Sequence, residues 1–330
     1  MASARTPSLG EGITERIEEI QQLAQSFISN VGRVMVGKAE TVELVMVALL
    51  CEGNLLLEDV PGMGKTVMAR AAARSLGCSF RRIQCTPDLL PSDVTGLQFY
   101  NQRSGAFEFH PGPLMANIVL VDEINRATPR TQSALLEAMQ EHQITVDLET
   151  MPLPRPFMLI ATQNPIELEG TFPLPEAQLD RFLLKLGVGY PSAEDEGEIL
   201  SRFREEDPLV ELGAITDGPS LTVLQTACRR VRVDESVRDY IVALVQATRE
   251  HPDVKLGASP RATLGLHRAA QALAAMRGRG FVTPDDVKYL AVPALAHRLI
   301  AKTEARLRGH SAEETVRSLL AQVPVPVEVV

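Results

Sequence analysis

The sequence predicts an α/β fold, a doubly wound parallel sheet followed by an all-helical domain. Two observations carry this prediction. Up to residue 190, short apolar runs typical of buried strands alternate with helical patterns, as in a parallel sheet covered by helices. After Tyr190-Pro191 only helical spacing follows. We therefore expect two domains, residues 1–190 and 191–330.

In the first domain the chain is expected to begin with two helices. Residues 14–31 show helical spacing after Thr14, a residue type that caps helices, and residues 39–52 form a second, mostly buried helix. A third helix is predicted from Lys65 to Leu76. The predicted strands are apolar runs bounded by turn residues, at 54–58, 79–84, 117–121, 157–162 and 183–187.

The second domain is predicted to be a bundle of helices. Start signals such as Ser259-Pro260 and Thr283-Pro284 precede several of them, and Ser311 to Glu314 resembles a capping box. The predicted helices cover residues 192–206, 220–230, 234–251, 260–277, 284–303 and 311–321.

Composition narrows the class of protein. The chain has 330 residues, 45% apolar and 23% charged, which suits a soluble globular protein with a sizeable core. A net charge of −9 disfavours a general nucleic-acid coat. The apolar run 44–51 is far shorter than the roughly 18 residues of a membrane span, and no signal peptide is expected. Four cysteines without a C-x-x-C pair fit a reduced, cytoplasmic chain.

A glycine-rich loop between a predicted strand and a predicted helix is the strongest chemical signal. Small residues let backbone N–H groups surround phosphates at a helix N-terminus. Lys65 would reach the β- and γ-phosphates, and Thr66 would bind Mg²⁺. Asp59 stands where the phosphate-loop pattern has Gly. The predicted phosphate-binding residues are Pro61, Gly62, Met63, Gly64, Lys65 and Thr66.

Two further strands end in polar residues. The run 117–121 is followed by Asp122 and Glu123, which we expect to hold Mg²⁺ and to polarise an attacking water, respectively. The run 157–162 is followed by Asn164, which either orients that water or only starts the turn before Pro165. Ligands bind at the carboxyl ends of strands in open α/β sheets, so both positions suit a nucleotide site.

Two arginines are candidates for sensing the nucleotide from outside the loop. Arg181, in LPEAQLDRF, could enter the nucleotide site of a neighbouring subunit as an arginine finger, or could pair with Asp180 or Glu176 on one surface. Arg261 follows Pro260 at a helix start, where a cation opposes the helix dipole and calls for a compensating anion, either a phosphate or a nearby Asp or Glu.

Over about residues 30–325, the chain resembles the AAA+ ATPases, and specifically the MoxR family. The resemblance is carried by the ordered segments LEDVPGMGKT, VLVDEINRA, LIATQNP, LPEAQLDRF and GASPRA. The resemblance implies a P-loop AAA+ core with a helical lid, and ATP and Mg²⁺ as ligands. It implies that Lys65 and Thr66 belong to Walker A, and Asp122 and Glu123 to Walker B. Asn164 would be sensor 1, Arg181 the finger and Arg261 sensor 2. Val36-Gly37 resembles the stretch that contacts adenine.

Two hairpins are predicted inside the first domain, and they fit the helix-2-insert clade that the resemblance indicates. Residues 97–110 turn at 102–105 and hold four of the chain's fourteen aromatic residues, while residues 143–156 form the second hairpin. The first hairpin would line a ring's pore or meet a client protein, or would only pack its aromatics at the sheet edge.

The resemblance implies a chaperone-like ATPase that remodels or matures partner protein complexes, including metal- or cofactor-containing enzymes. An arginine finger implies a homo-oligomeric ring, a hexamer by resemblance, and the expected partners are a von Willebrand factor A domain protein and a client enzyme. The alternatives are a nucleic-acid motor, a chelatase-type motor subunit and a nucleotide-gated binding module. No direct nucleic-acid binding is expected, because the 97–110 hairpin carries only Arg103 and His110 as basic residues.

Overall fold

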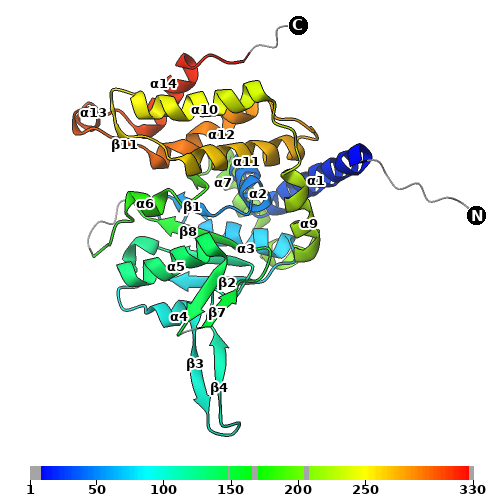
Figure 1. The fold of residues 1–330 in the computed structure, drawn as a ribbon. Helices are drawn as coiled ribbons and strands as arrows, with labels where there is room; N and C mark the ends of the chain where they lie inside the picture. Colours follow the sequence, from blue (N-terminus) through cyan, green and yellow to red (C-terminus); the bar gives the residue numbers. More distant parts are fainter. Residues whose placement is uncertain (1–8, 148, 166–169, 204–207, 327–330) are drawn as a thin grey trace, which may run out of the picture. The chain divides into compact units, whose positions relative to one another are not determined.

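The structure is a computed structural model that describes residues 9–147, 149–165, 170–203 and 208–326. In it the protein divides into two compact units. The sheet unit is residues 27–221, and the helical unit is residues 222–330 together with 1–26. Helix α1 (Leu9–Gly32) and helix α9 (Gly218–Cys228) run through the two division points. Figure 1 traces the chain through both units.

In the described part of the sheet unit, five parallel strands pair in the order β2-β5-β8-β1-β9. The three inner strands are buried apolar runs, as expected for a sheet with both faces covered. This confirms the predicted doubly wound α/β class. The strands are β1 (Leu55–Glu58), β2 (Phe80–Gln84), β5 (Ile118–Asp122), β8 (Met158–Gln163) and β9 (Leu184–Leu186).

Helices connect these strands because parallel neighbours need a crossover. Helix α2 precedes β1, α3 follows it, and a large core cluster that includes Leu56, Val119 and Leu136 lies on one side of the sheet. The elements are α2 (Ala39–Leu50), α3 (Lys65–Ser75), α4 (Pro91–Thr95), the 3-10 helix η1 (Ile124–Arg126), α5 (Pro129–Glu141) and α6 (Glu176–Leu179).

Both predicted hairpins are present. Strands β3 (Gly96–Asn101) and β4 (Ala106–Pro111) pair antiparallel after the short helix α4 and project as an arm (Figure 1). Strands β6 (Gln143–Val146) and β7 (Glu149–Pro152) form the second hairpin. Phe109 packs against the core, whereas Tyr100 and Phe107 are exposed near the tip and contact each other edge to face. Part of the aromatic content therefore holds the arm in place and part faces outward.

The units do not divide at residue 190, where the sequence changes character. Helices α7 (Ala193–Arg202) and α8 (Pro208–Glu211) belong to the sheet unit. Arg74 of α3 donates from Nε to the Leu212 carbonyl at 2.6 Å, and the Ile215 N–H donates to the Ser75 carbonyl at 2.7 Å. These side-chain and backbone hydrogen bonds attach residues 208–216 to α3, so the compact sheet unit extends to Leu221.

The helical unit has the later helices of the predicted bundle, whereas the first predicted helix, over 192–206, corresponds to α7 in the sheet unit. The helix expected over 284–303 ends at Leu295, and the chain then forms the 3-10 helix η2 (Ala296–Arg298) and a short strand β11 (Ile300–Ala301) that pairs with β10 (Val254–Leu256). The other helices are α10 (Glu235–Glu250), α11 (Pro260–Met276), α12 (Pro284–Leu295), α13 (Thr303–Leu307) and α14 (Ala312–Gln322). Within the described residues, no helix combines the length and apolarity that a membrane span requires.

A buried carboxylate organises the start of α12. Asp286 is fully buried and accepts hydrogen bonds from the Thr283 N–H and hydroxyl, both at 2.9 Å, and from the Arg279 guanidinium, while Arg277 pairs with it at 3.3 Å. Burial raises the pKa of the Asp286 carboxyl, but the hydrogen bonds from Arg279 and Thr283 outweigh it and hold the pKa below its usual range. This carboxylate thus joins the α11–α12 turn to the helix it caps.

We expect Asp286→Ala to lower the unfolding free energy of the helical unit by about 2–3 kcal/mol, because Arg279 and the Thr283 N–H lose their partner. Since the folded-state pKa is lowered, this stabilisation is present above the unfolded pKa of about 3.9 and is lost as the pH falls further. The measurement is urea unfolding at pH 7 and below pH 4. Asp285→Ala, at a side chain 85% exposed, is the matched control. Equal effects at the two positions would contradict the assignment.

Candidate functional site

A cleft lies at the edge of the sheet where β1, β5 and β8 end. Parallel strands in register finish at one edge, so the polar residues that follow them meet there. The cleft encloses about 380 Å³. The predicted phosphate loop, acidic pair and Asn164 thus share one site. Its lining is Pro61, Gly62, Met63, Gly64, Lys65, Thr66, Val67, Arg82, Gln84, Asp122, Glu123, Thr162 and Asn164.

The glycine-rich loop turns tightly into α3. Gly62 and Gly64 have φ values of 88° and 80°, a region that side-chain-bearing residues rarely adopt, so glycine is required for this path. The Lys65 ammonium donates to the carbonyl oxygens of Asp59 at 2.6 Å and Val60 at 3.3 Å. Burial lowers the pKa of Lys65, against the opposing effect of the nearby carboxylates of the site. The Lys65 side chain therefore folds back against its own loop, where bound phosphates would also lie.

Asp59 replaces the first glycine of the pattern and has a structural task. Its Oδ2 accepts the N–H groups of Val188 and Gly189, each at 2.7 Å, and its Oδ1 accepts the Val60 N–H at 3.1 Å. β1 and β9 pair in parallel, so Asp59 at the end of one strand reaches the chain leaving the other. The departure from the motif therefore ties the start of the loop to residues 188–189.

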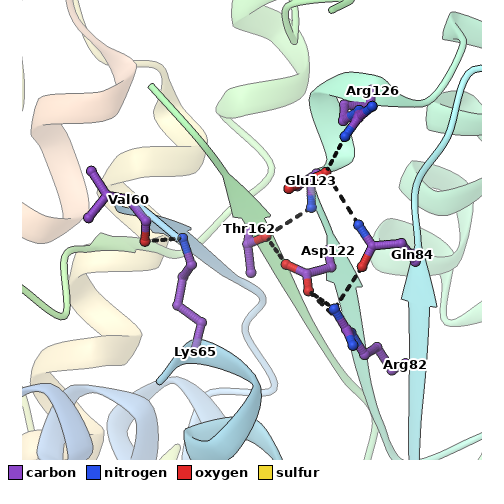
Figure 2. A network of polar contacts seen from close by, with 8 residues as sticks. All are labelled: Val60, Lys65, Arg82, Gln84, Asp122, Glu123, Arg126 and Thr162. Carbon is purple, nitrogen blue, oxygen red and sulfur yellow. Dashed lines mark hydrogen bonds and ion pairs between the residues drawn. The ribbon is translucent and has the colours of Figure 1, made fainter. Parts of the chain in front are cut away.

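A buried hydroxyl joins the acidic pair to the neighbouring strand. Thr162 of β8 donates to Asp122 Oδ1 at 2.6 Å and accepts the Glu123 N–H at 2.9 Å (Figure 2). Glu123 has a φ of 55°, the left-handed region, which costs a non-glycine residue free energy and is common at functional sites. Thr162 thus fixes one oxygen of Asp122 and the unusual backbone of Glu123 together.

Cationic and amide side chains surround the acidic pair (Figure 2). Arg82 of β2 donates to Asp122 Oδ2 from Nε at 3.2 Å and from a terminal nitrogen at 2.6 Å. Glu123 accepts from Gln84 at 3.3 Å and from Arg126 at 3.0 Å. Sequence reasoning missed Arg82, Gln84, Arg126 and Thr162. Arg82 and Gln84 could have been found from their spacing, because polar residues two apart on a strand point to the same face.

The predicted adenine-contacting stretch lies near the segment that Asp59 holds. A Cβ built on Gly37 would come within 2.3 Å of the Asp195 carboxylate, so this close approach requires glycine. Lys38 donates to the Tyr190 carbonyl at 2.9 Å. Val36, which precedes Gly37, is buried. Residues 36–38 and 188–195 therefore form a connected region within the sheet unit.

Neither candidate arginine is among the residues that line the cleft. Arg181 donates to the Leu136 carbonyl at 3.3 Å and lines a separate hollow with residues of α5. Arg261 is in the helical unit at the start of α11, where its N–H donates to the Ser259 hydroxyl. Asn164 is buried and lines the cleft. The roles of these three residues stay predictions.

The donor set of the cleft fits a magnesium–nucleotide complex. A Thr66 hydroxyl and an Asp122 carboxylate lie on the same cleft as the phosphate loop. Mg²⁺ at such sites takes one or two protein oxygens and completes its octahedron with water and phosphate oxygens. Among the residues described, no group of three or more His, Cys, Asp and Glu side chains could hold a metal ion by itself.

Two family models match this chain. The model of the ATPase family associated with various cellular activities (AAA) matches residues 54–184, and that of the AAA lid domain matches residues 246–319. The chain is 51% identical to the uncharacterized protein YeaC of Bacillus subtilis, over 94% of this chain and 97% of that one. It is 42% identical to Chaperone MoxR1 of Mycobacterium tuberculosis, over 97% and 86%.

A solved structure of a candidate ATPase from Cytophaga hutchinsonii has the same fold. Its TM-score is 0.89 at 38% identity, and the match covers 95% of this chain and 98% of that one. The sheet and the helical elements around the cleft are therefore shared with that protein.

We expect Asp59→Ala to lower the unfolding free energy of the sheet unit by about 1–3 kcal/mol, because the N–H groups of Val188 and Gly189 lose their acceptor. Asp59→Asn keeps an oxygen acceptor, so its unfolding free energy should fall by less than that of Asp59→Ala. Thermal and urea unfolding measure both. Asp239→Ala, on the exposed face of α10, is the control. Wild-type stability in Asp59→Ala would show that these contacts are not made in solution.

Proposed function

Because the chain belongs to the MoxR family of AAA+ ATPases, we propose that it hydrolyses Mg²⁺-bound ATP in this cleft and uses the reaction to remodel or mature partner proteins. One observation carries the proposal. The phosphate loop, the Asp122-Glu123 pair and Asn164 come from three strands and line one cleft at the carboxyl edge of the sheet. Phosphoryl transfer depends on this kind of positioning.

The loop and α3 bind the phosphates. Backbone N–H groups at Gly62 and Gly64 and the N-terminus of α3 supply a positive cradle, and Lys65 leaves the carbonyls of Asp59 and Val60 for phosphate oxygens. Bound Mg²⁺ would neutralise charge that develops on the phosphates. Thr66 and Asp122 are the residues that would hold it.

Glu123 is the proposed acceptor of the water's proton. Two features support this role: Glu123 lines the cleft, and its left-handed backbone and the bond from its N–H to Thr162 fix its main chain just after β5. Asn164, buried at the end of β8, would orient the same water through its amide. Arg261 is proposed to sense the nucleotide from the lid.

A homo-oligomeric ring, a hexamer by family resemblance, would complete the site. Arg181 lies against α5 and outside the cleft of its own chain, which suits a residue that serves a neighbour. A guanidinium supplied in trans stabilises transition-state charge. Hydrolysis would then depend on contact between subunits.

Partner recognition is assigned to the projecting arm. Tyr100 and Phe107 are 54% and 70% exposed and lie opposite each other on β3 and β4, an apolar pair that suits protein contact. The proposed partners are a von Willebrand factor A domain protein and a client enzyme. A relative named Chaperone MoxR1 supports a chaperone role. The few basic residues of the arm argue against a nucleic-acid track.

The central test is Mg²⁺-dependent phosphate release. Glu123→Gln should lower kcat by about 100-fold or more while still binding ATP, because it removes only the proton acceptor. Lys65→Ala should weaken nucleotide binding itself. Glu235→Gln and Lys255→Ala, both exposed in the helical unit, are matched controls. Normal turnover in Glu123→Gln would refute its role, and absence of Mg²⁺-ATP turnover in the wild-type chain would refute the function.

Mixing two inactive variants tests the finger. Arg181→Ala keeps its own Glu123, and Glu123→Gln keeps Arg181. In a randomly mixed ring, about a quarter of the sites combine an intact Glu123 with a neighbour's intact Arg181, so about a quarter of the wild-type rate should return. Co-expressed chains and phosphate release measure it. No recovery in rings that contain both variants would place Arg181 outside the reaction.

A further inference from the structure

Arg82 lines the cleft, and sequence reasoning gave it no role. It lies on β2, the edge strand of the sheet, and its side chain turns to the carboxyl end of β5 (Figure 2). Its guanidinium makes two hydrogen bonds to Asp122 Oδ2, and a terminal nitrogen also donates to Gln84 Oε1 at 2.7 Å. A guanidinium is therefore paired with the carboxylate proposed to hold Mg²⁺.

Both oxygens of Asp122 are engaged, but unequally. Oδ1 accepts from Thr162, which is buried and also accepts the Glu123 N–H, so that bond cannot open without leaving a buried donor unpaired. Oδ2 pairs with Arg82, whose side chain is 47% exposed. Oδ2 is therefore the oxygen that can change its partner at low cost.

Mg²⁺ and the Arg82 guanidinium compete for this oxygen. Mg²⁺ binds at about 2.0–2.1 Å and demands near-octahedral geometry, which leaves little room for a doubly hydrogen-bonded guanidinium on the same atom. Arginine does not lose its proton in proteins, so it cannot become neutral in place. It has to move, and its position on an edge strand with half the side chain exposed allows this.

We propose that Arg82 is a positioning residue that holds Asp122 in its metal-binding orientation and gives way when Mg²⁺ enters with the nucleotide. The inference rests on the proposed nucleotide site. It makes the apparent Mg²⁺ affinity a property set by the Arg82–Asp122 pair, because every binding event includes breaking that pair. Metal-free Asp122 keeps a charge partner, so the unliganded site is not left with an unpaired, mostly buried carboxylate.

The test is the Mg²⁺ dependence of binding of a fluorescent ADP analogue, which reports the site without turnover. In Arg82→Gln the Mg²⁺ concentration for half-maximal binding should fall about fivefold, the size of a partly exposed ion pair. The melting temperature without nucleotide should fall too, and the rise on adding Mg²⁺ and ADP should be larger than in wild type. Arg82→Lys keeps the charge but not the paired donors, so its Mg²⁺ concentration for half-maximal binding should lie between those of wild type and Arg82→Gln.

Arg81→Gln is the matched control, since Arg81 is the adjacent arginine on β2 and alternation sends its side chain to the other face of the strand. An unchanged Mg²⁺ requirement in both Arg82 variants, or a higher one, would overturn the proposal that Arg82 gives way to Mg²⁺ at Asp122. Should Arg82→Gln not fold, Arg82→Lys decides alone by the same criterion. Failure of the wild-type chain to bind the analogue would instead overturn the proposed function, so the two failures are distinguishable.

Discussion

The cleft depends on the hydrogen-bonded register of β1, β5 and β8. Leu120 lies opposite Ile160, and Ile160 lies opposite Leu55, so the three strands reach the same edge together. A one-residue slip in a parallel pair would turn every following side chain to the other face. The phosphate loop follows β1, Asp122 is the last residue of β5, and Thr162 is the second-last residue of β8. Burial of the apolar strand faces therefore fixes the geometry of a polar site.

Within that frame, polar side chains outside the main motifs carry the detailed positioning. Thr162 of β8 bonds to both Asp122 and Glu123 at the end of β5, and Asp59 links the phosphate loop to the chain after β9. Each contact joins segments far apart in the sequence. The loss of the first glycine from the loop pattern therefore has a physical reason, because an aspartate at that place accepts two backbone N–H groups that glycine could not reach.

Charge in the site is balanced locally rather than by the chain as a whole. The protein is acidic, yet Lys65, Arg82 and Arg126 lie near the two carboxylates of the cleft. Nucleotide and metal would each replace one partner in this arrangement, phosphate for the carbonyls at Lys65 and metal for the guanidinium at Asp122. The β3–β4 arm is separate from this chemistry, and it exposes the aromatic pair that suits contact with another protein.

The sequence by itself determined the α/β class, the strand runs, both hairpins and the motif residues that meet in the cleft. These are recorded in local patterns, namely apolar runs of strand length, turn residues and short motifs. Tertiary structure alone decided the rest. The sheet unit extends to Leu221 because residues 208–216 bond to α3, and α12 stops at Leu295 because β11 pairs with β10. The tasks of Asp59, Arg82 and Thr162 depend on partners that are close only after the strands pair, and no local pattern encodes those distances.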